Sequence, residues 1–323
     1  MYNETNTPFK VAVVQATPIF LDRAATLDKA CELIAFAGRE GARLIDFPEA
    51  FIPAYPDWVW TVPPGQDDLL DELYAELLAN AVTIPSDATQ QLCHAAKQAG
   101  AYVVMGMSER NVEASGASLY NTLLYIDDQG HILGKHRKLV PTGGERLVWA
   151  QGDGSTLQVY DTPFGKLGGL ICWENYMPLA RYAMYAWGTQ IYVAATWDRG
   201  QPWLSTLRHI AKEGRVYVLG CSIVMRKDDI PDRFAFKQRF YADANEWINV
   251  GDSAIVNPDG FFIAGPVRHK EDILYAEIDP RQMRGPKWML DVAGHYARPD
   301  VFELIVHTDE YKMIRREKRN EES

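Results

Sequence analysis

The sequence predicts an α/β fold, with one domain that contains a mixed β-sheet and helices packed against it. Short apolar runs of strand length alternate with stretches whose apolar residues recur at helical spacing, which favours parallel strands joined through helices. Three pairs of apolar runs are joined by turn sequences instead, which adds antiparallel hairpins. The chain has 323 residues and is 47% hydrophobic, so it can bury a large core.

Each element in the first half of the chain has a local signal. The first two apolar runs stop at Pro18 and Pro48, as strands do. Helices are expected where apolar residues recur every three or four positions, and Ser86 or Asp87 can cap the third one. The turn at residues 127–130 predicts a hairpin. The expected strands are residues 11–16, 42–47, 102–107, 119–126 and 132–135, and the expected helices are residues 27–38, 69–81 and 88–99.

The second half continues the alternation. Turns at residues 162–165 and 258–260 predict two more hairpins. Residues 225–251 are charged and show no regular pattern, which is typical of a functional or mobile segment. The expected strands are residues 166–172, 191–195, 216–224, 254–257, 261–264 and 273–278, and the expected helices are residues 179–187 and 203–214.

The domain organisation is interpreted as simple. No internal repeat and no linker rich in glycine and serine interrupts the chain, so residues 1–308 are interpreted as one domain. Residues 309–323 are dense in charge and are expected to be a solvated or disordered tail.

Composition excludes several classes of function. A net charge of −10 argues against a nucleic-acid partner, and no apolar run is long enough to cross a membrane. The N-terminal residues are polar, so no signal peptide is expected, and four cysteines in so long a chain do not make a disulfide scaffold. We therefore expect a cytoplasmic protein. Dinucleotide-binding, P-loop, zinc-protease and serine-hydrolase motifs are absent, and the seven histidines lack ligand spacing, so no cofactor and no metal are expected.

Four segments place polar residues where expected strands end. They contain Glu49, Lys138, Glu145 and Cys172. Taken singly, Glu49 and Glu145 are more often surface carboxylates, and Lys138 is more often a solvated residue at a sheet edge. For Cys172, a structural and a chemical role are about equally favoured, because it ends an apolar strand before a polar, aromatic turn. The other cysteines lie within expected helices or strands and are interpreted as small hydrophobic residues.

Together, these four segments resemble the nitrilase superfamily of carbon–nitrogen hydrolases, and they are closest to its nitrilase branch. Glu49, Lys138 and Cys172 occur in that family's order, and the resemblance covers roughly residues 8–308. The segment Cys172-Trp173-Glu174 is similar to that of true nitrilases, and Glu145 matches an additional active-site glutamate. The chain departs from the family at Ala54 and Ala150, where glycine is common, which puts the pocket shape in doubt but not the chemistry.

The resemblance implies an α-β-β-α sandwich and hydrolysis of a small nitrile to a carboxylic acid and ammonia. Cys172 would be the nucleophile of a thioimidate and then a thioester, and Glu49 would be the general base and acid. Lys138 and the backbone N–H of Trp173 would stabilise developing negative charge, and Glu145 would orient Lys138 or water. The resemblance also implies a homo-oligomer, either a dimer or a larger spiral.

Two other functions remain open. An amidase or carbamoyl hydrolase of the same superfamily would use the same residues, although Trp173-Glu174 favours a nitrilase. A non-catalytic binding scaffold is disfavoured because Glu49, Lys138 and Cys172 are all present. The substrate side chain is not predicted: aromatic residues such as Tyr55 and Trp197 can line a pocket for an aryl or arylaliphatic nitrile, or pack in a core or interface. Trp58, Trp60 and Trp203 are open to the same two interpretations.

Overall fold

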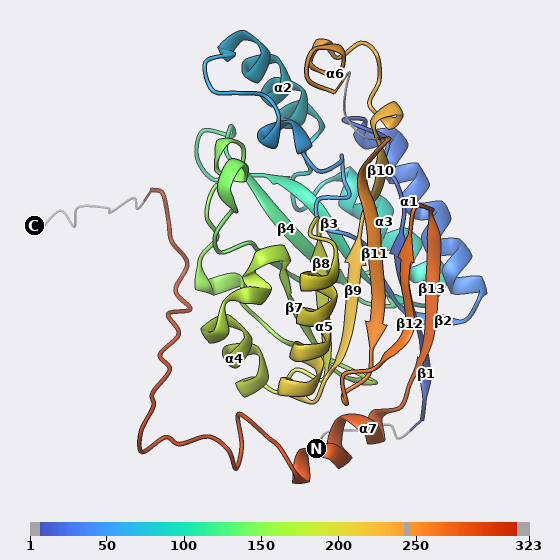
Figure 1. Cartoon of the computed structure of the whole chain (residues 1–323), viewed down its shortest axis with the longest axis vertical. Helices are drawn as coiled ribbons and strands as arrows, with labels where there is room; N and C mark the ends of the chain where they lie inside the picture. The colour runs from blue at the N-terminus through green and yellow to red at the C-terminus, as the bar shows by residue number, and fades with distance from the viewer. Residues whose placement is uncertain (1–6, 242–245, 315–323) are drawn as a thin grey trace, which may run out of the picture.

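The computed structural model of the chain describes residues 7–241 and 246–314. Two β-sheets pack face to face, and helices cover the outer face of each sheet (Figure 1). The predicted α-β-β-α sandwich is therefore confirmed. Both sheets are mixed, with parallel strands in the middle and antiparallel strands toward the edges.

The strand order places consecutive β-α-β units side by side. The first sheet has the order β13 (Asp272–Ile278), β1 (Phe9–Gln15), β2 (Ala42–Asp46), β3 (Tyr102–Arg110), β4 (Leu119–Ile126) and β5 (Ile132–Arg137). The second has the order β10 (Val224–Arg226), β11 (Trp247–Val256), β9 (Tyr217–Ser222), β8 (Ile191–Thr196), β7 (Gly165–Ile171) and β6 (Tyr160–Thr162), and β12 (Phe262–Arg268) pairs with β11. The three predicted hairpins are the pairs β4–β5, β6–β7 and β11–β12.

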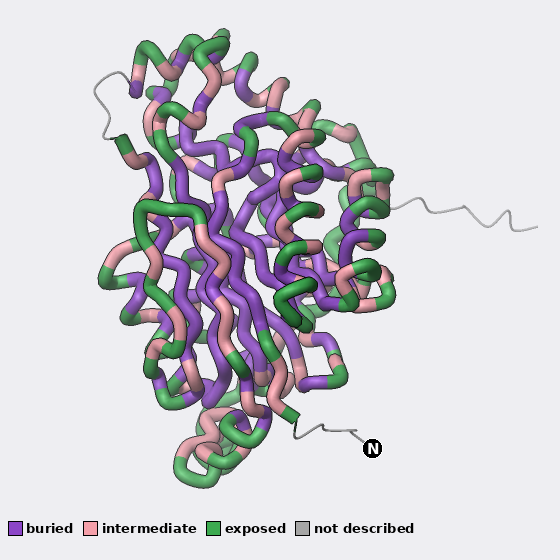
Figure 2. Tube along the Cα trace, turned by 90° about the vertical axis from the view of Figure 1, so that its right-hand side faces the viewer, coloured by how far each residue is buried: buried purple, intermediate pink, exposed green. Residues whose placement is uncertain are grey.

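Three apolar clusters correspond to the three interfaces between the four layers. In β1, Val11 and Val13 belong to the cluster between the sheets, whereas Ala12 and Val14 belong to the cluster under the first helix layer. Because both faces of such a strand are buried, its sequence is a continuous apolar run without alternation. Figure 2 shows the strands as largely buried, with exposure concentrated on helices and loops.

The helices form two outer layers and several peripheral pieces. α1 (Arg23–Arg39) and α3 (Asp87–Ala99) cover the first sheet, and α4 (Pro178–Ala186) and α5 (Gln201–Gly214) cover the second. Of the two cap candidates for α3, Ser86 is the one that accepts the hydrogen bond from the helix. Other helices are α2 (Asp67–Asn80), α6 (Ala235–Phe240) and α7 (Pro280–Arg284), and the last two were not expected from the sequence. No helix in the described ranges is both long and apolar enough to span a bilayer.

Residues 225–251, for which the sequence predicted no helix or strand, contain several regular elements. Apart from residues 242–245, which lie outside the described part, this segment contains most of β10, a 3₁₀ turn at Lys227–Asp229, helix α6 and the first half of β11. The pattern was hidden because β11 buries polar residues. Asn249 donates to the carbonyl of Trp197, and Asp252 pairs with Arg268, so these side chains are satisfied inside the fold without producing an apolar run.

The C-terminal region follows the helix layer of the second sheet. After α7 and a 3₁₀ turn at Gly285–Trp288, the chain runs outside α4 without helix or strand (Figure 1). The predicted tail starts at residue 309, and its first residues are exposed, although the Tyr311 N–H donates to Asp153 at 2.7 Å. Residues 315–323 lie outside the described part of the chain, so the domain boundary stays a prediction.

Candidate active site

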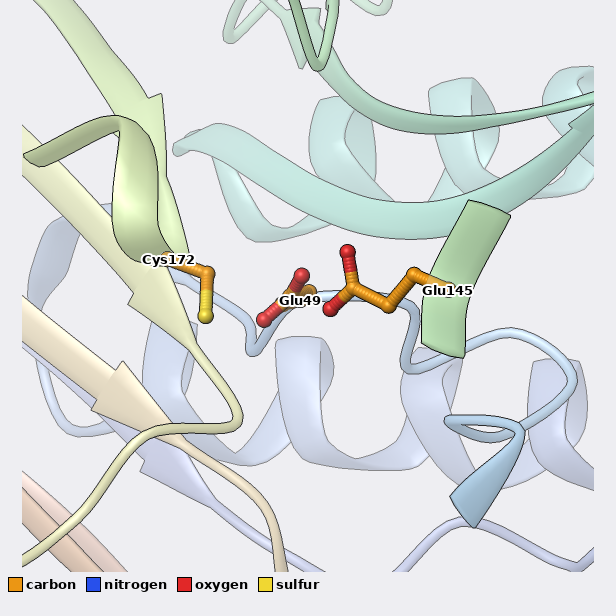
Figure 3. A group of neighbouring side chains, drawn as sticks. All are labelled: Glu49, Glu145 and Cys172. Atoms are coloured by element: carbon orange, nitrogen blue, oxygen red, sulfur yellow. The ribbon is translucent and has the colours of Figure 1, made fainter. Parts of the chain in front are cut away.

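Segments that follow strands of both sheets bring the four predicted residues together. Glu49 lies in the loop after β2, Lys138 directly follows β5, and Cys172 directly follows β7. Glu145 lies in a 3₁₀ turn at Gly143–Leu147. All four are buried, and Figure 3 shows the Glu49 carboxylate between Cys172 and Glu145. One oxygen of each carboxylate and the Cys172 sulfur lie within 4.8 Å of one another.

Lys138 links the two carboxylates. Its ammonium donates to Glu49 Oε1 at 2.8 Å and to Glu145 Oε2 at 2.7 Å, and its side chain is fully buried. Burial opposes the charge, but Glu49, Cys172 and Glu145 together raise the pKa of Lys138 above its usual range. The lysine is therefore an ammonium held between two acids.

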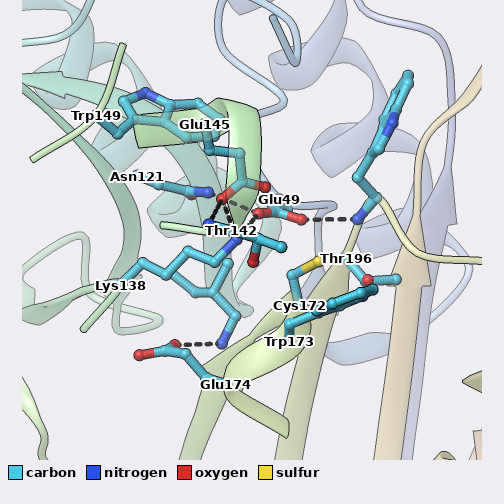
Figure 4. Close-up of polar contacts among 12 residues, drawn as sticks. Glu49, Asn121, Lys138, Thr142, Glu145, Trp149, Cys172, Trp173, Glu174 and Thr196 are labelled. Atoms are coloured by element: carbon cyan, nitrogen blue, oxygen red, sulfur yellow. Dashed lines mark hydrogen bonds and ion pairs between the residues drawn. The ribbon is translucent and has the colours of Figure 1, made fainter. Parts of the chain in front are cut away.

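Glu49 is fixed by three donors. Lys138 and the amide of Asn121, on β4, donate to Oε1, the latter at 2.6 Å, and the backbone N–H of Trp197 donates to Oε2 at 2.7 Å (Figure 4). Burial raises the pKa of Glu49; Lys138 opposes this shift, and the nearby Glu145 carboxylate adds to it. Because one ammonium cannot neutralise both carboxylates, Glu49 is suited to take up a proton.

Glu145 also has all its oxygens engaged. Its Oε2 accepts from Lys138 and from the Thr142 N–H, each at 2.7 Å, and its Oε1 accepts from the Tyr55 hydroxyl at 2.7 Å. The carboxylate therefore gives the ammonium a second, fixed acceptor besides Glu49.

Cys172 sits at a strained turn. It opens a 3₁₀ turn at Cys172–Tyr176 and has φ 53, which is uncommon for a residue other than glycine. Burial, and then the Glu49 carboxylate, raise the pKa of the Cys172 thiol well above its usual range; Lys138 and a hydrogen bond from Thr196 lower it in part. The thiol is therefore protonated in the resting site and needs a base to become a nucleophile.

Some of the aromatic residues line a pocket beside the cluster, and others are packed in the apolar core. Trp173 is half-exposed and, with Trp197, lines a pocket of about 740 Å³ beside the cluster. Tyr55 is buried behind that wall: its ring stacks on Trp197 with centroids 4.3 Å apart, and it does not line the pocket. The other lining residues are Asp57, Trp60, Thr61, Thr142, Gly143, Asp198, Arg199, Tyr241, Trp247 and Ile248, whereas Trp58 and Trp203 are packed in the apolar core.

Sequence reasoning missed polar residues that hold this site. Asn121 and Thr122 interrupt the apolar run of β4, and this was an available signal. Glu174 was quoted within a motif but given no contact, yet its buried carboxylate accepts from the backbone N–H groups of Leu139 and Ile171. His136, on β5 two residues before Lys138, contacts Glu174 as well.

The site is better suited to proton transfer than to metal binding. Glu49, Glu145 and Cys172 offer three ligand atoms close together. The Lys138 ammonium, however, already lies between the two carboxylates at hydrogen-bond distance from each. A metal cation would have to replace this positive charge or be repelled by it.

Comparisons with known proteins identify the family of the chain. The family model described as carbon–nitrogen hydrolase matches residues 10–286. The chain is 42% identical to an aliphatic nitrilase of Sinorhizobium fredii (strain HH103), over 93% of this chain and 96% of that protein. It is also 42% identical to a bifunctional nitrilase/nitrile hydratase of Nicotiana tabacum, over 95% and 88% of the two chains. The crystal structure of an amidase from Nesterenkonia sp. is similar in fold, with a TM-score of 0.64 at 18% identity, over 88% of this chain and 96% of that one. The chain therefore belongs to the carbon–nitrogen hydrolase family, as a relative of its nitrilases.

Proposed function

We propose that the protein is a nitrilase that converts a small organic nitrile and two molecules of water to a carboxylic acid and ammonia. The observation that carries this proposal is the buried cluster in which a base, an ammonium and a thiol meet: Glu49, Lys138 and Cys172. The similarity to nitrilases over nearly the whole chain supports a nitrile substrate.

The reaction begins with proton transfer from the Cys172 thiol to Glu49. The thiolate adds to the nitrile carbon, and protonated Glu49 returns the proton to nitrogen, which gives a thioimidate. Water adds and one of its protons passes through Glu49 to nitrogen, which gives a tetrahedral intermediate. Its hydroxyl proton then also passes through Glu49 to nitrogen, so that ammonia leaves and a thioester remains. A second water, activated in the same way, releases the acid and restores the thiol.

Each addition develops negative charge on nitrogen or oxygen. The Lys138 ammonium supplies a positive charge that is already in place and fully desolvated, which makes its effect large. The backbone N–H of Trp173 is proposed as the second donor. Glu145 keeps Lys138 in position, because it accepts from that ammonium and is itself held by Tyr55 and Thr142.

The proposed substrate-binding surface is the pocket beside the cluster. Trp173 and Trp197 present aromatic walls, together with Trp60 and Trp247, which suits an apolar or aromatic side chain on the nitrile. Tyr55 is proposed to act on substrate only indirectly, through the ring of Trp197 and the carboxylate of Glu145.

The working assembly is proposed to be at least a homodimer. Large apolar side chains are exposed on α4 and on the C-terminal segment beside it, including Leu179, Tyr296, Val301, Phe302 and Ile305. A surface of this kind favours a second copy of the chain as its cover. Light scattering that shows a stable, active monomer would contradict this.

A cytoplasmic location is also proposed, because the four cysteines are free thiols, as expected in a reducing compartment.

The test of function is ammonia release from a panel of aliphatic, aromatic and arylacetonitriles. Wild type and Cys93→Ala are expected to turn over at least one nitrile, and Cys172→Ala none, because only Cys172 lies beside Glu49 and Lys138. The amide corresponding to the best nitrile is run as a separate substrate. Faster hydrolysis of that amide would favour the amidase alternative, and full nitrile turnover by Cys172→Ala would refute the proposal.

A further inference from the structure

A second buried ion pair lies behind the nucleophile and takes no part in the chemistry described above. His136 Nε2 is 3.0 Å from Glu174 Oε2, and both side chains are almost fully buried. His136 lies on β5 in the first sheet, and Glu174 lies in the turn after β7 in the second. Neither residue lines the pocket beside the cluster.

The hydrogen-bond partners define the charge on both groups. His136 Nδ1 is 3.2 Å from the carbonyl oxygen of Thr156, which can only accept, so this nitrogen carries a proton. Nε2 faces the Glu174 carboxylate, which already accepts two backbone N–H groups, so this nitrogen also donates. His136 is therefore an imidazolium and Glu174 a carboxylate. Burial opposes both charges, but each partner favours the charge of the other, which raises the pKa of His136 and lowers that of Glu174.

Glu174 joins the two segments that carry the reacting groups. Its Oε1 accepts from the Leu139 N–H at 2.6 Å, and its Oε2 accepts from the Ile171 N–H at 2.7 Å. Leu139 directly follows Lys138, and Ile171 directly precedes Cys172. The two segments come from different sheets, so strand pairing does not fix the distance between them. One carboxylate does so through a hydrogen bond to each.

We propose that Glu174 and His136 are positioning residues that fix the place of the Lys138 ammonium relative to the Cys172 sulfur. Glu174 connects the two backbones, and His136 holds Glu174 ionised and correctly turned. This inference rests on the proposed function, because it assigns to the pair the alignment of groups used in that reaction. A misplacement of about 1 Å at reacting groups can lower turnover on the order of a hundredfold.

The carboxylate geometry makes Glu174→Gln an informative variant. Each oxygen of Glu174 accepts one of the two backbone N–H groups, whereas an amide has only one oxygen. In either orientation of the glutamine, one backbone N–H faces an NH₂ group, so one of the two segments is released. His136→Gln is the second variant, and it leaves both backbone bonds possible but removes the positive charge that holds the carboxylate.

Glu109→Gln is the matched control. Glu109, on β3, is also a buried carboxylate paired to β5, through Arg137 at 2.6 Å. Arg137 adjoins His136 in the sequence and therefore lies on the opposite face of β5. None of its hydrogen bonds reaches the segment that carries Cys172. A purely structural loss of a buried charge should therefore affect Glu109→Gln and Glu174→Gln alike.

The experiment measures kcat and KM on the best nitrile, thermal unfolding, and the rate of Cys172 alkylation by iodoacetamide. For Glu174→Gln we expect kcat, normalised to the amount of Cys172 that iodoacetamide can modify, to fall roughly a hundredfold with little change in KM. Alkylation of Cys172 should also slow, because Lys138 moves away from the sulfur. His136→Gln should lower both kcat and the alkylation rate, by a smaller factor. Glu109→Gln should lower the unfolding temperature but leave kcat and alkylation near wild type.

Each outcome decides the matter. Wild-type kcat in folded Glu174→Gln, or an equal fall in Glu109→Gln, would overturn the proposal, as would an effect on KM alone. If Glu174→Gln does not fold, His136→Gln decides by the same criteria. If the wild-type protein hydrolyses no nitrile, the proposed function fails, but the positioning role is still decided by alkylation: equal rates in wild type and Glu174→Gln would refute it.

Discussion

Replacing Glu145 by glutamine should make Cys172 more reactive toward an alkylating reagent while making the enzyme slower. In one orientation the glutamine keeps the contacts to the lysine: its oxygen can take the place of Oε2 and accept from Lys138 and the Thr142 N–H. Its NH₂ group then faces the Tyr55 hydroxyl, which loses its acceptor. The change therefore removes one negative charge with little loss of packing.

The size of the effect follows from the distance. A Glu145 oxygen and the Cys172 sulfur lie within 4.8 Å of each other. With an effective dielectric constant of about 20, a negative charge at that distance disfavours the thiolate by about 3 kcal/mol. Removing it should increase the thiolate population, and with it the alkylation rate at neutral pH, on the order of a hundredfold. Lys138 keeps its bond to Glu49 but is held less firmly, so turnover should fall on the order of a hundredfold.

The assay compares iodoacetamide alkylation of Cys172 with nitrile turnover in the same preparations. Tyr55→Phe is the control, because it removes a hydrogen bond to Glu145 but not the charge. Alkylation of Glu145→Gln that is unchanged or slower than wild type would refute the electrostatic reasoning. Chromatography of the products should also show a larger share of amide, because a loosely held Lys138 stabilises the oxyanion less and favours departure of sulfur over ammonia.

Three further predictions concern stability and cofactors. Asp46 is buried on β2, and its carboxyl oxygens have no hydrogen-bond partner among the described residues. Burial raises the pKa of Asp46, so the folded protein keeps this carboxyl protonated at a pH where the unfolded chain has lost the proton. The contribution of Asp46 to stability therefore becomes less favourable as pH rises. Asp46→Val should therefore raise the unfolding temperature, and more at pH 8 than at pH 5; equal gains at both pH values would contradict this. Ala54 has φ 128, which glycine favours, so Ala54→Gly should stay within about 1 kcal/mol of wild type because relief of strain offsets the added chain entropy. The buried helical Ala183→Gly should lose about 1–2 kcal/mol in chemical denaturation, and equal losses would argue against strain at Ala54. Exhaustive chelation should leave turnover unchanged, because Lys138 occupies the position between the carboxylates; loss of activity that one added metal restores would contradict this.

The expected elements that agreed with the structure were those with strong local signals. The hairpin turns, the cap of α3 and the continuous apolar strands depend on neighbours within a few residues, so a short stretch of sequence is enough to predict them. The first part of β11 was not predicted, because Asn249 and Asp252 find their hydrogen-bond partners in other segments of the chain. Within a short stretch of sequence, such polar residues are typical of a loop. Asp46, in contrast, lies inside an expected apolar strand and is buried there, and its carboxyl oxygens have no hydrogen-bond partner among the described residues.

Motifs within short stretches of the chain identify the residues that can carry the chemistry. Four ordered segments name a thiol, a lysine and two glutamates, and each lies where an expected strand ends. How these groups act on one another depends on the folded arrangement. The Lys138 contact to Glu49 spans 89 positions, and the Glu49 contact to the backbone of Trp197 spans 148. The charge states, the division of aromatic residues between pocket and core, and the bridge made by Glu174 all depend on how two separate sheets pack. Side-chain periodicity reports only which face of an element is buried, and it carries no information about which distant group that face meets.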